Sequence, residues 1–339
     1  MKLNALKAVY CYFFPEVRPL LKEVQDLIPD DFFLVSTPAE DIEKKLESLF
    51  NPPLKIPSTL EGNINLDEIH VPILERIVNA YSPLVPALKD FNYRYPTPGS
   101  SEGIYKLIAK LRAQNVDKIY ILNGEYEGYQ NYAEDLGMKV ISVDLEKTNL
   151  SELEKGYWFI SNPSARDGNI IPNEVINKIC NLGNKVILDL AYVGSTKKYE
   201  FDVSNPNIST VFLSLSKPYG LFRYRIGFTF SREPINSLYG NKWFKDPVRL
   251  LQGLKVVEEL PPGSLYDKYR PVQEKIIEEL NKDFNLNMKP SDAFLLGNSK
   301  LDDVSEDKKN LVQNFLRGNH YRFCLTPYFE REEKLNKIS

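Results

Sequence analysis

The residues best suited to chemistry lie in segment 214–217 (SLSK) and at Arg225. Lys217 follows an apolar run, so we expect it at the end of a strand, facing a cleft. Desolvation and a nearby cation disfavour the ammonium form, and the neutral amine is a nucleophile. Two hydroxyls before the lysine and a guanidinium after it are donors that can hold a phosphate. An amine beside a phosphate site suits a Schiff base with pyridoxal phosphate. Alternatively, Lys217 merely caps a strand and Arg225 begins the next one.

A second candidate is Asp189, near the end of the apolar run 185–190 (KVILDL), with Tyr192 shortly after it. An acidic side chain at the end of such a strand is costly to bury without a cationic partner. A protonated pyridine nitrogen is such a partner, and the ion pair keeps the ring an electron sink. Tyr192 could then reach the phenolic oxygen of the cofactor. The alternative is an aspartate that caps the turn after the strand.

Three more candidates follow strand-like runs or precede a helical one. Asn162 ends one such run, and its amide could donate to the cofactor's O3′, although Asn-Pro alone signals a turn. Ser100 and Ser101 open a helical pattern, where backbone N–H groups bind anions, or they form a plain helix cap. Tyr126 comes after the run 117–123, and its ring could stack on a cofactor or simply pack in the core.

Arg322 is the last candidate, in the strand-like run 320–326 (HYRFCLT) near the C-terminus. A guanidinium there could bind a substrate carboxylate through two parallel hydrogen bonds. It could equally be an exposed arginine on an edge strand.

The elements that must position these groups alternate between strand-like and helix-like runs. This alternation predicts a mainly parallel sheet covered by helices on both faces, with ligands at the carboxyl ends of its strands. Strands are predicted at 117–123, 139–145, 158–161, 185–190, 210–216 and 226–231, and helices at 102–114, 126–137, 172–183, 247–260 and 271–284. We divide the chain into an N-terminal segment (1–60), a large cofactor-binding domain (61–235) and a small α/β domain (236–339).

Composition narrows the class of protein. The chain has 339 residues, with 43 Lys+Arg and 46 Asp+Glu, and this near-neutral balance argues against a nucleic-acid partner. No apolar run reaches the roughly 18 residues of a membrane span, and no signal peptide is recognisable. Cys11, Cys180 and Cys324 form no CxxC pair, and His70 and His320 are the only histidines. We therefore expect a cytoplasmic protein without a metal site.

The order of these motifs resembles the fold-type I pyridoxal-phosphate enzymes. More narrowly, it resembles the class I/II aminotransferase family, including histidinol-phosphate aminotransferase and its threonine-phosphate decarboxylase relatives. The resemblance spans residues 95 to 335 approximately. It implies a mainly parallel seven-stranded sheet sandwiched by helices, a smaller C-terminal α/β domain, pyridoxal phosphate as cofactor, and a homodimer.

The resemblance also implies a role for each candidate. Lys217 would carry the cofactor as a Schiff base and move the substrate's proton, and Asp189 would pair with the pyridinium nitrogen. Asn162 and Tyr192 would bond O3′, with Asn162 also near the substrate, and Arg322 would take the substrate α-carboxylate. Tyr126 would stack on the cofactor ring. The phosphate would be held by Ser100, Ser101, Ser214, Ser216 and Arg225.

The sequence departs from the family pattern in three places. Segment 222–225 (FRYR) is bulky and has an extra cation where the family has small residues. The loop that begins at Asn162 lacks its second proline. The tyrosine that the family often gives to its partner subunit could be Tyr81, Tyr93 or Tyr95.

The resemblance predicts an aminotransferase that exchanges an amino group between an amino acid and a 2-oxo acid. The alternative within the family is a decarboxylase, lyase or cyclase that acts on an amino acid with the same cofactor. A non-catalytic relative that only binds pyridoxal phosphate is a third possibility, although the chain shows no basic recognition helix of the kind found in DNA-binding regulators.

Overall fold

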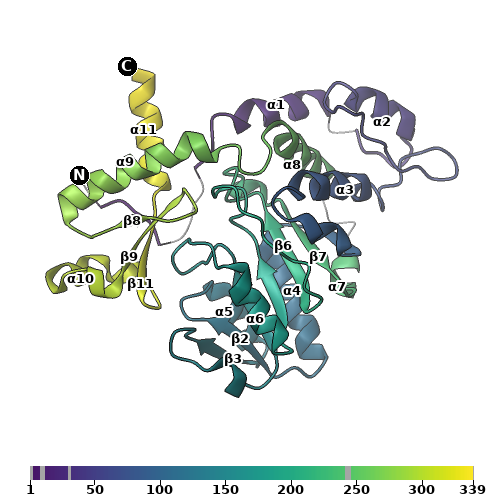
Figure 1. Ribbon diagram of the computed structural model, residues 1–339. Helices are drawn as coiled ribbons and strands as arrows, with labels where there is room; N and C mark the ends of the chain where they lie inside the picture. Colours follow the sequence, from purple (N-terminus) through teal and green to yellow (C-terminus); the bar gives the residue numbers. More distant parts are fainter. Residues whose placement is uncertain (1–2, 8–11, 30–31, 241–245, 339) are drawn as a thin grey trace.

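The computed structural model describes residues 3–7, 12–29, 32–240 and 246–338, and a seven-stranded sheet forms its centre (Figure 1). The strand order is β1-β7-β6-β5-β4-β2-β3. Strand β7 runs in the direction opposite to the other six strands, which are parallel to one another. The predicted mainly parallel sheet is therefore confirmed. Its strands are β1 (Tyr93–Thr97), β2 (Lys118–Leu122), β3 (Lys139–Val143), β4 (Tyr157–Ser161), β5 (Lys185–Asp189), β6 (Ile208–Ser214) and β7 (Gly227–Ser231).

Helices cover both faces of this sheet, as predicted. Side chains of a strand alternate between faces. In β4, Phe159 joins the core under α4 and α5, while Trp158 and Ile160 join the core on the other face. Helix α6 packs against β5, and α8 packs against α3. The bounds are α3 (His70–Tyr81), α4 (Ser100–Ala113), α5 (Glu127–Asp135), α6 (Asn173–Asn181), α7 (Asn236–Gly240) and α8 (Pro247–Glu259).

Strand β1 was not predicted from the sequence. It contains Pro96, which has no N–H to donate and which normally marks an edge strand or no strand at all. The structure places β1 at one edge of the sheet, where it pairs with β7 alone.

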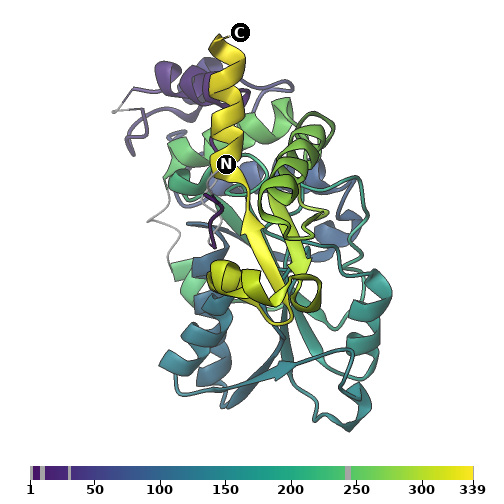
Figure 2. The same ribbon diagram turned by 90° about the vertical axis from the view of Figure 1, so that its left-hand side faces the viewer.

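A smaller antiparallel sheet lies beside the large one, in front of it in Figure 2. Its strands are β8 (Lys289–Pro290), β9 (Leu296–Lys300), β10 (Leu316–Arg317) and β11 (His320–Cys324), in the order β10-β11-β9-β8. It is accompanied by α9 (Tyr266–Phe284), α10 (Glu306–Val312) and α11 (Thr326–Ile338). Helix α9 begins at Tyr266 rather than at the predicted Pro271. Although proline favours a helix start, the residues before it are already helical here.

The N-terminal region touches both parts of the molecule. Helix α1 (Val17–Leu27) packs against α8, and α2 (Ala39–Leu46) follows it in the chain. Leu6 pairs with Cys324 at the end of β11, with each backbone N–H donating to the other's carbonyl at 3.2 and 2.9 Å. The domain boundaries given above stay predictions.

Cys180 and Cys324 are free and buried, and Cys11 lies outside the described residues. Within the described ranges, no group of three or more His, Cys, Asp or Glu side chains could hold a metal ion. None of the described helices combines the length and apolar character needed to cross a membrane.

Candidate active site

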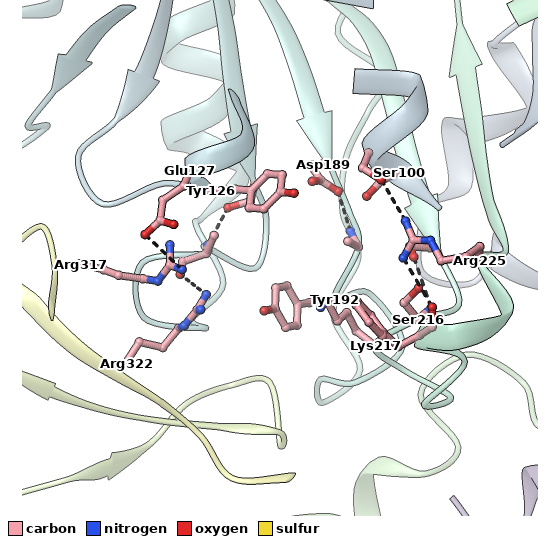
Figure 3. Close-up of a pocket in the computed structure, with 16 residues that line it drawn as sticks. Ser100, Tyr126, Glu127, Asp189, Tyr192, Ser216, Lys217, Arg225, Arg317 and Arg322 are labelled. Carbon is pink, nitrogen blue, oxygen red and sulfur yellow. Dashed lines mark hydrogen bonds and ion pairs between the residues drawn. The ribbon is translucent and has the colours of Figure 1, made fainter. Parts of the chain in front are cut away.

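A pocket of about 290 Å³ opens at the carboxyl ends of the central strands, where a doubly covered sheet is expected to bind ligands. Figure 3 shows Arg225 on one side of it, Arg317 and Arg322 on the opposite side, and Asp189, Tyr126 and Tyr192 between them. All the residues predicted for the site except Asn162 line this pocket: Ser100, Ser101, Tyr126, Asp189, Tyr192, Ser214, Ser216, Lys217, Arg225 and Arg322.

The side of the pocket at Arg225 has the groups that an anion needs. Arg225 Nη2 donates to Ser101 Oγ and to the carbonyl of Pro98, both at 2.9 Å. Ser101 lies in the first turn of α4, whose free backbone N–H groups favour a bound anion. Ser216 Oγ is buried and makes no hydrogen bond with any residue that the structure describes. A phosphate would satisfy this hydroxyl.

Close packing shapes this anion site. Gly99, the residue before α4, has φ +77, and a Cβ there would lie 2.5 Å from Arg225 Nη2. A Cβ at Gly227 would lie 2.5 Å from the carbonyl carbon of Gly99. Arg225 itself has φ +54, a conformation that non-glycine residues seldom adopt. The backbone is therefore arranged to bring the guanidinium against the start of α4.

Lys217 lies just beyond β6 and is half-buried between two aromatic rings. Its Nζ is 5.9 Å from the ring centre of Tyr192 and 5.5 Å from that of Phe222. Phe222 also lies 5.5 Å from the guanidinium carbon of Arg225, so one ring is near both cations. Phe222 was not predicted as a site residue. The one feature of the sequence that points to Phe222 is the bulky segment 222–225, which departs from the family pattern.

Asp189 ends β5 and is buried at the base of the pocket. Burial raises the pKa of its carboxyl to about 6, and a hydrogen bond from the Tyr129 hydroxyl (3.0 Å) opposes that rise. The backbone N–H of Ala191 donates to the other carboxyl oxygen at 3.1 Å. A cation in the pocket would offset the cost of burying this charge.

Tyr126 lies at the mouth of the pocket and precedes α5. Its side chain is partly exposed, and its ring meets that of Tyr129 edge to face, with the centres 5.4 Å apart. Partial burial raises the pKa of the Tyr126 hydroxyl above its ordinary value. One face of the ring is thus held by α5 while the residue lines the cavity.

The opposite side of the pocket holds two arginines from the smaller sheet. Arg322 is 4% exposed, and β11 lies between β10 and β9, so the alternative of an exposed edge-strand arginine is wrong. Its Nη1 and Nη2 donate to the carbonyls of Ala165 and Lys7, each at 2.6 Å. Its Nε is buried without a hydrogen-bond partner among the described residues.

Arg317 is a pocket residue that the sequence did not reveal. Burial, together with the charge of Arg322, lowers the pKa of its guanidinium to about 10. Its Nη1 donates to the carbonyl of Glu125 at 3.3 Å, and its Nη2 lies 3.8 Å from Glu127 Oε1. Its Nε, like that of Arg322, is buried with no hydrogen-bond partner among the described residues. Two desolvated guanidinium groups side by side favour an anionic ligand.

Residues 95–258 match the model of the family described as aminotransferase class I and II. This match covers just under half of the chain and supports the predicted resemblance to the class I and II aminotransferases. Among curated proteins, none matches the sequence.

Three solved structures are similar to this chain in fold. A pyridoxal-phosphate-bound putative aminotransferase from Clostridium difficile 630 has a TM-score of 0.66 and 12% identity, covering 94% of this chain and 87% of its own. Histidinol-phosphate aminotransferase from Clostridium acetobutylicum has a TM-score of 0.56 and 18% identity, covering 76% and 86%. L-threonine-O-3-phosphate decarboxylase from Porphyromonas gingivalis has a TM-score of 0.53 and 13% identity, covering 80% and 96%. At these identities the likeness is one of fold.

The family cofactor, pyridoxal phosphate, fits the residues of this pocket. The unsatisfied hydroxyl of Ser216 and the guanidinium of Arg225 suit its phosphate, and the buried Asp189 suits a protonated ring nitrogen. Lys217 lines the same pocket and offers the amine.

Asn162 is the predicted site residue that the structure does not bring into the pocket lining. Its amide is engaged with the backbone of Ile171, donating to the carbonyl and accepting from the N–H, both at 2.9 Å. These two hydrogen bonds hold the loop that follows β4 in place. Ser161, one residue earlier, lines the pocket instead. The arrangement therefore does not support the predicted contacts of Asn162 with cofactor and substrate.

The three tyrosines considered for the partner subunit differ in exposure. Tyr81 is fully buried, and Tyr95 is 6% exposed with its hydroxyl accepting from the N–H of Ile235. Tyr93 is 39% exposed. Of the three, only Tyr93 presents much of its ring to the surface of one chain.

Proposed function

We propose that this protein is an aminotransferase, which moves an amino group between an amino acid and a 2-oxo acid. The observation that carries the proposal is the two-ended pocket, with an anion site at Arg225 and a pair of guanidinium groups at Arg317 and Arg322. Lys217 and Asp189 line the same pocket. The phosphate would occupy one end, and the substrate carboxylate would occupy the other.

Each end would hold its ligand by hydrogen bonds. Ser101, Ser216 and Arg225 would bind the phosphate, together with the N–H groups that begin α4. Arg322 would bind the substrate α-carboxylate, which keeps that carboxylate in place while another bond at Cα breaks. Bound pyridoxal phosphate supplies an electron sink for the charge that develops at Cα.

The side chains between the two ends would handle protons. Lys217 would take the proton from the substrate Cα and return it, as a general base and then an acid. Asp189 would keep the ring nitrogen protonated, and Tyr192 would bond the phenolic oxygen. Phe222 and Tyr192 flank the amine and would exclude water from it.

Arg317 gives a specific reason to retain a second candidate, an amino-acid decarboxylase or lyase of the same family. A second buried guanidinium could hold a side-chain carboxylate or phosphate. If Arg322 also turned to that group, the α-carboxylate would be left free to leave. In both cases we infer that the substrate is an amino acid with a second anionic group.

The test uses the purified enzyme loaded with pyridoxal phosphate. Amino acids that have acidic or phosphorylated side chains are supplied with a panel of 2-oxo acids, and the products are separated by mass spectrometry. Transfer of 15N from donor to acceptor would support the aminotransferase, whereas release of carbon dioxide without transfer would support the second candidate. We also propose that the protein is cytoplasmic and forms a homodimer. Light scattering, which measures the molar mass in solution, would test the dimer.

A further inference from the structure

We propose that Glu125 is a positioning residue that sets how tightly the pocket binds a substrate carboxylate, acting through Ser161 and Ala165 on Arg322. The inference rests on the proposed function, in which Arg322 binds that carboxylate. Glu125 lies between β2 and α5 and is 4% exposed. It is not among the described residues that line the pocket, so it would act on ligands through its neighbours.

The Glu125 carboxyl group is held by three donors. Oε1 accepts from the N–H of Ser161 at 3.1 Å, and Oε2 accepts from the Ser161 hydroxyl and from the N–H of Tyr126 at 3.2 Å. Burial raises the pKa of this carboxyl to about 7, with the charge of Asp189 as a smaller cause in the same direction. A buried carboxyl with three donors fixes the groups that surround it, because leaving any of them unpaired would be costly.

Ser161 passes this constraint to the next turn of chain. Its hydroxyl oxygen accepts from the N–H of Ala165 at 2.6 Å while its hydrogen is directed to Glu125. The carbonyl of Ala165 in turn accepts from Arg322 Nη1 at 2.6 Å. The chain of hydrogen bonds therefore runs without a gap from Glu125 to the guanidinium that would bind the carboxylate.

A second contact from Glu125 reaches the other arginine. The backbone carbonyl of Glu125 accepts from Arg317 Nη1 at 3.3 Å. Both guanidinium groups thus donate hydrogen bonds to backbone carbonyls whose position depends on Glu125. Both also have a buried Nε without a hydrogen-bond partner among the described residues. Loss of the Glu125 side chain would loosen the two groups together while leaving the residues at Arg225 in place.

The test measures binding of maleate to the enzyme loaded with pyridoxal phosphate, by isothermal titration calorimetry. Maleate is a dicarboxylate without an amino or oxo group, so it binds without reacting. Compared with the wild type, we expect Glu125→Ala and Ser161→Ala each to raise the Kd of maleate about tenfold, because each removes a hydrogen bond that orients a charged group. Since both residues act through one chain of bonds, the double variant should be no weaker than the weaker single variant.

Two further variants separate positioning from general damage. Glu125→Gln keeps an acceptor for the Ser161 hydroxyl and should restore most of the affinity. Glu134→Gln is the control, an exposed glutamate on the neighbouring helix α5 whose Oε1 accepts from Gln130. The Kd of pyridoxal phosphate should stay near the wild-type value in all variants. The Tm should stay near its wild-type value in Glu134→Gln and fall in Glu125→Ala, where three buried donors lose their acceptor.

Additive losses in the double variant, or a maleate Kd unchanged in Glu125→Ala, would overturn the inference. Absence of maleate binding to the wild type would also overturn it, because the two arginines would then not take a carboxylate. If maleate behaves as expected but no amino transfer is found, the proposed function fails and the role of Glu125 stands.

Discussion

At the residue scale, the chemistry of the pocket depends on carboxyl groups that the fold buries. Burial is the main cause that raises the pKa of the Asp189 carboxyl to about 6 and the pKa of the Glu125 carboxyl to about 7. Each therefore ionises near neutral pH, where a small change in its surroundings alters its charge.

For Asp189 we predict that Asp189→Asn lowers the turnover number at least a hundredfold, because it removes the charge that would stabilise a protonated ring nitrogen. The Tyr129 hydroxyl donates to the same carboxyl. Tyr129→Phe should therefore be milder, within about tenfold of the wild type. Steady-state kinetics with an accepted amino acid measures the turnover number of each variant. Equal losses in the two variants would contradict the assigned role of Asp189.

The raised pKa of Glu125 also predicts how stability of the apoprotein depends on pH. A carboxyl whose pKa is higher in the folded state binds its proton more tightly there, so its contribution to stability is complete below the ordinary pKa of 4.5 and is lost as pH rises through about 7. Between pH 5 and pH 8 the wild type should lose on the order of 2 kcal/mol more free energy of unfolding than Glu125→Gln. Urea unfolding at the two pH values measures the difference. If the free energy of unfolding changed equally with pH in the two proteins, the pKa of Glu125 would not be raised in the folded state.

At the element scale, the junctions between strands and helices carry the site, and most of these junctions were predictable. Continuous apolar runs predicted β2, β4, β5 and β6 to within one or two residues. The groups after them could be placed because parallel strands end at one edge of the sheet. Strand β1 could not be predicted, since its pattern is polar and interrupted by Pro96.

The start of α4 offers a prediction at this scale. Gly99→Ala would place a Cβ 2.5 Å from Arg225 Nη2, at a residue whose φ is +77. We expect the Kd of pyridoxal phosphate to rise about tenfold or more, because a small displacement of the guanidinium costs a charge-assisted hydrogen bond.

Gly137→Ala is the matched control for that substitution. Gly137 has a similar positive φ of +70, but a Cβ there meets nothing within 4 Å. It should cost about 1 kcal/mol of stability through backbone strain and leave the Kd of pyridoxal phosphate unchanged. If both variants weakened the cofactor equally, close packing at Arg225 would not be the cause.

At the scale of the whole molecule, the pocket is completed by parts of the chain far apart in sequence. Arg317 and Arg322 come from the smaller sheet, and Lys7 contributes a carbonyl to Arg322 and an ion pair of 2.9 Å to Glu127. Sequence order could not show that Arg317 and Glu125 meet, because such contacts depend on how the two sheets face each other. The run 320–326 made Arg322 a candidate for binding a carboxylate, and the family resemblance implied the substrate α-carboxylate as that group.

The most direct test of the whole account concerns Lys217. The enzyme loaded with pyridoxal phosphate is treated with sodium borohydride, which fixes a pyridoxal group to the amine that carries it, and is then digested and analysed by peptide mass spectrometry. The account predicts a yellow protein, a single modified peptide containing Lys217, and loss of both features in Lys217→Ala. A protein that stays colourless in excess cofactor, or a modification at another lysine, would contradict it.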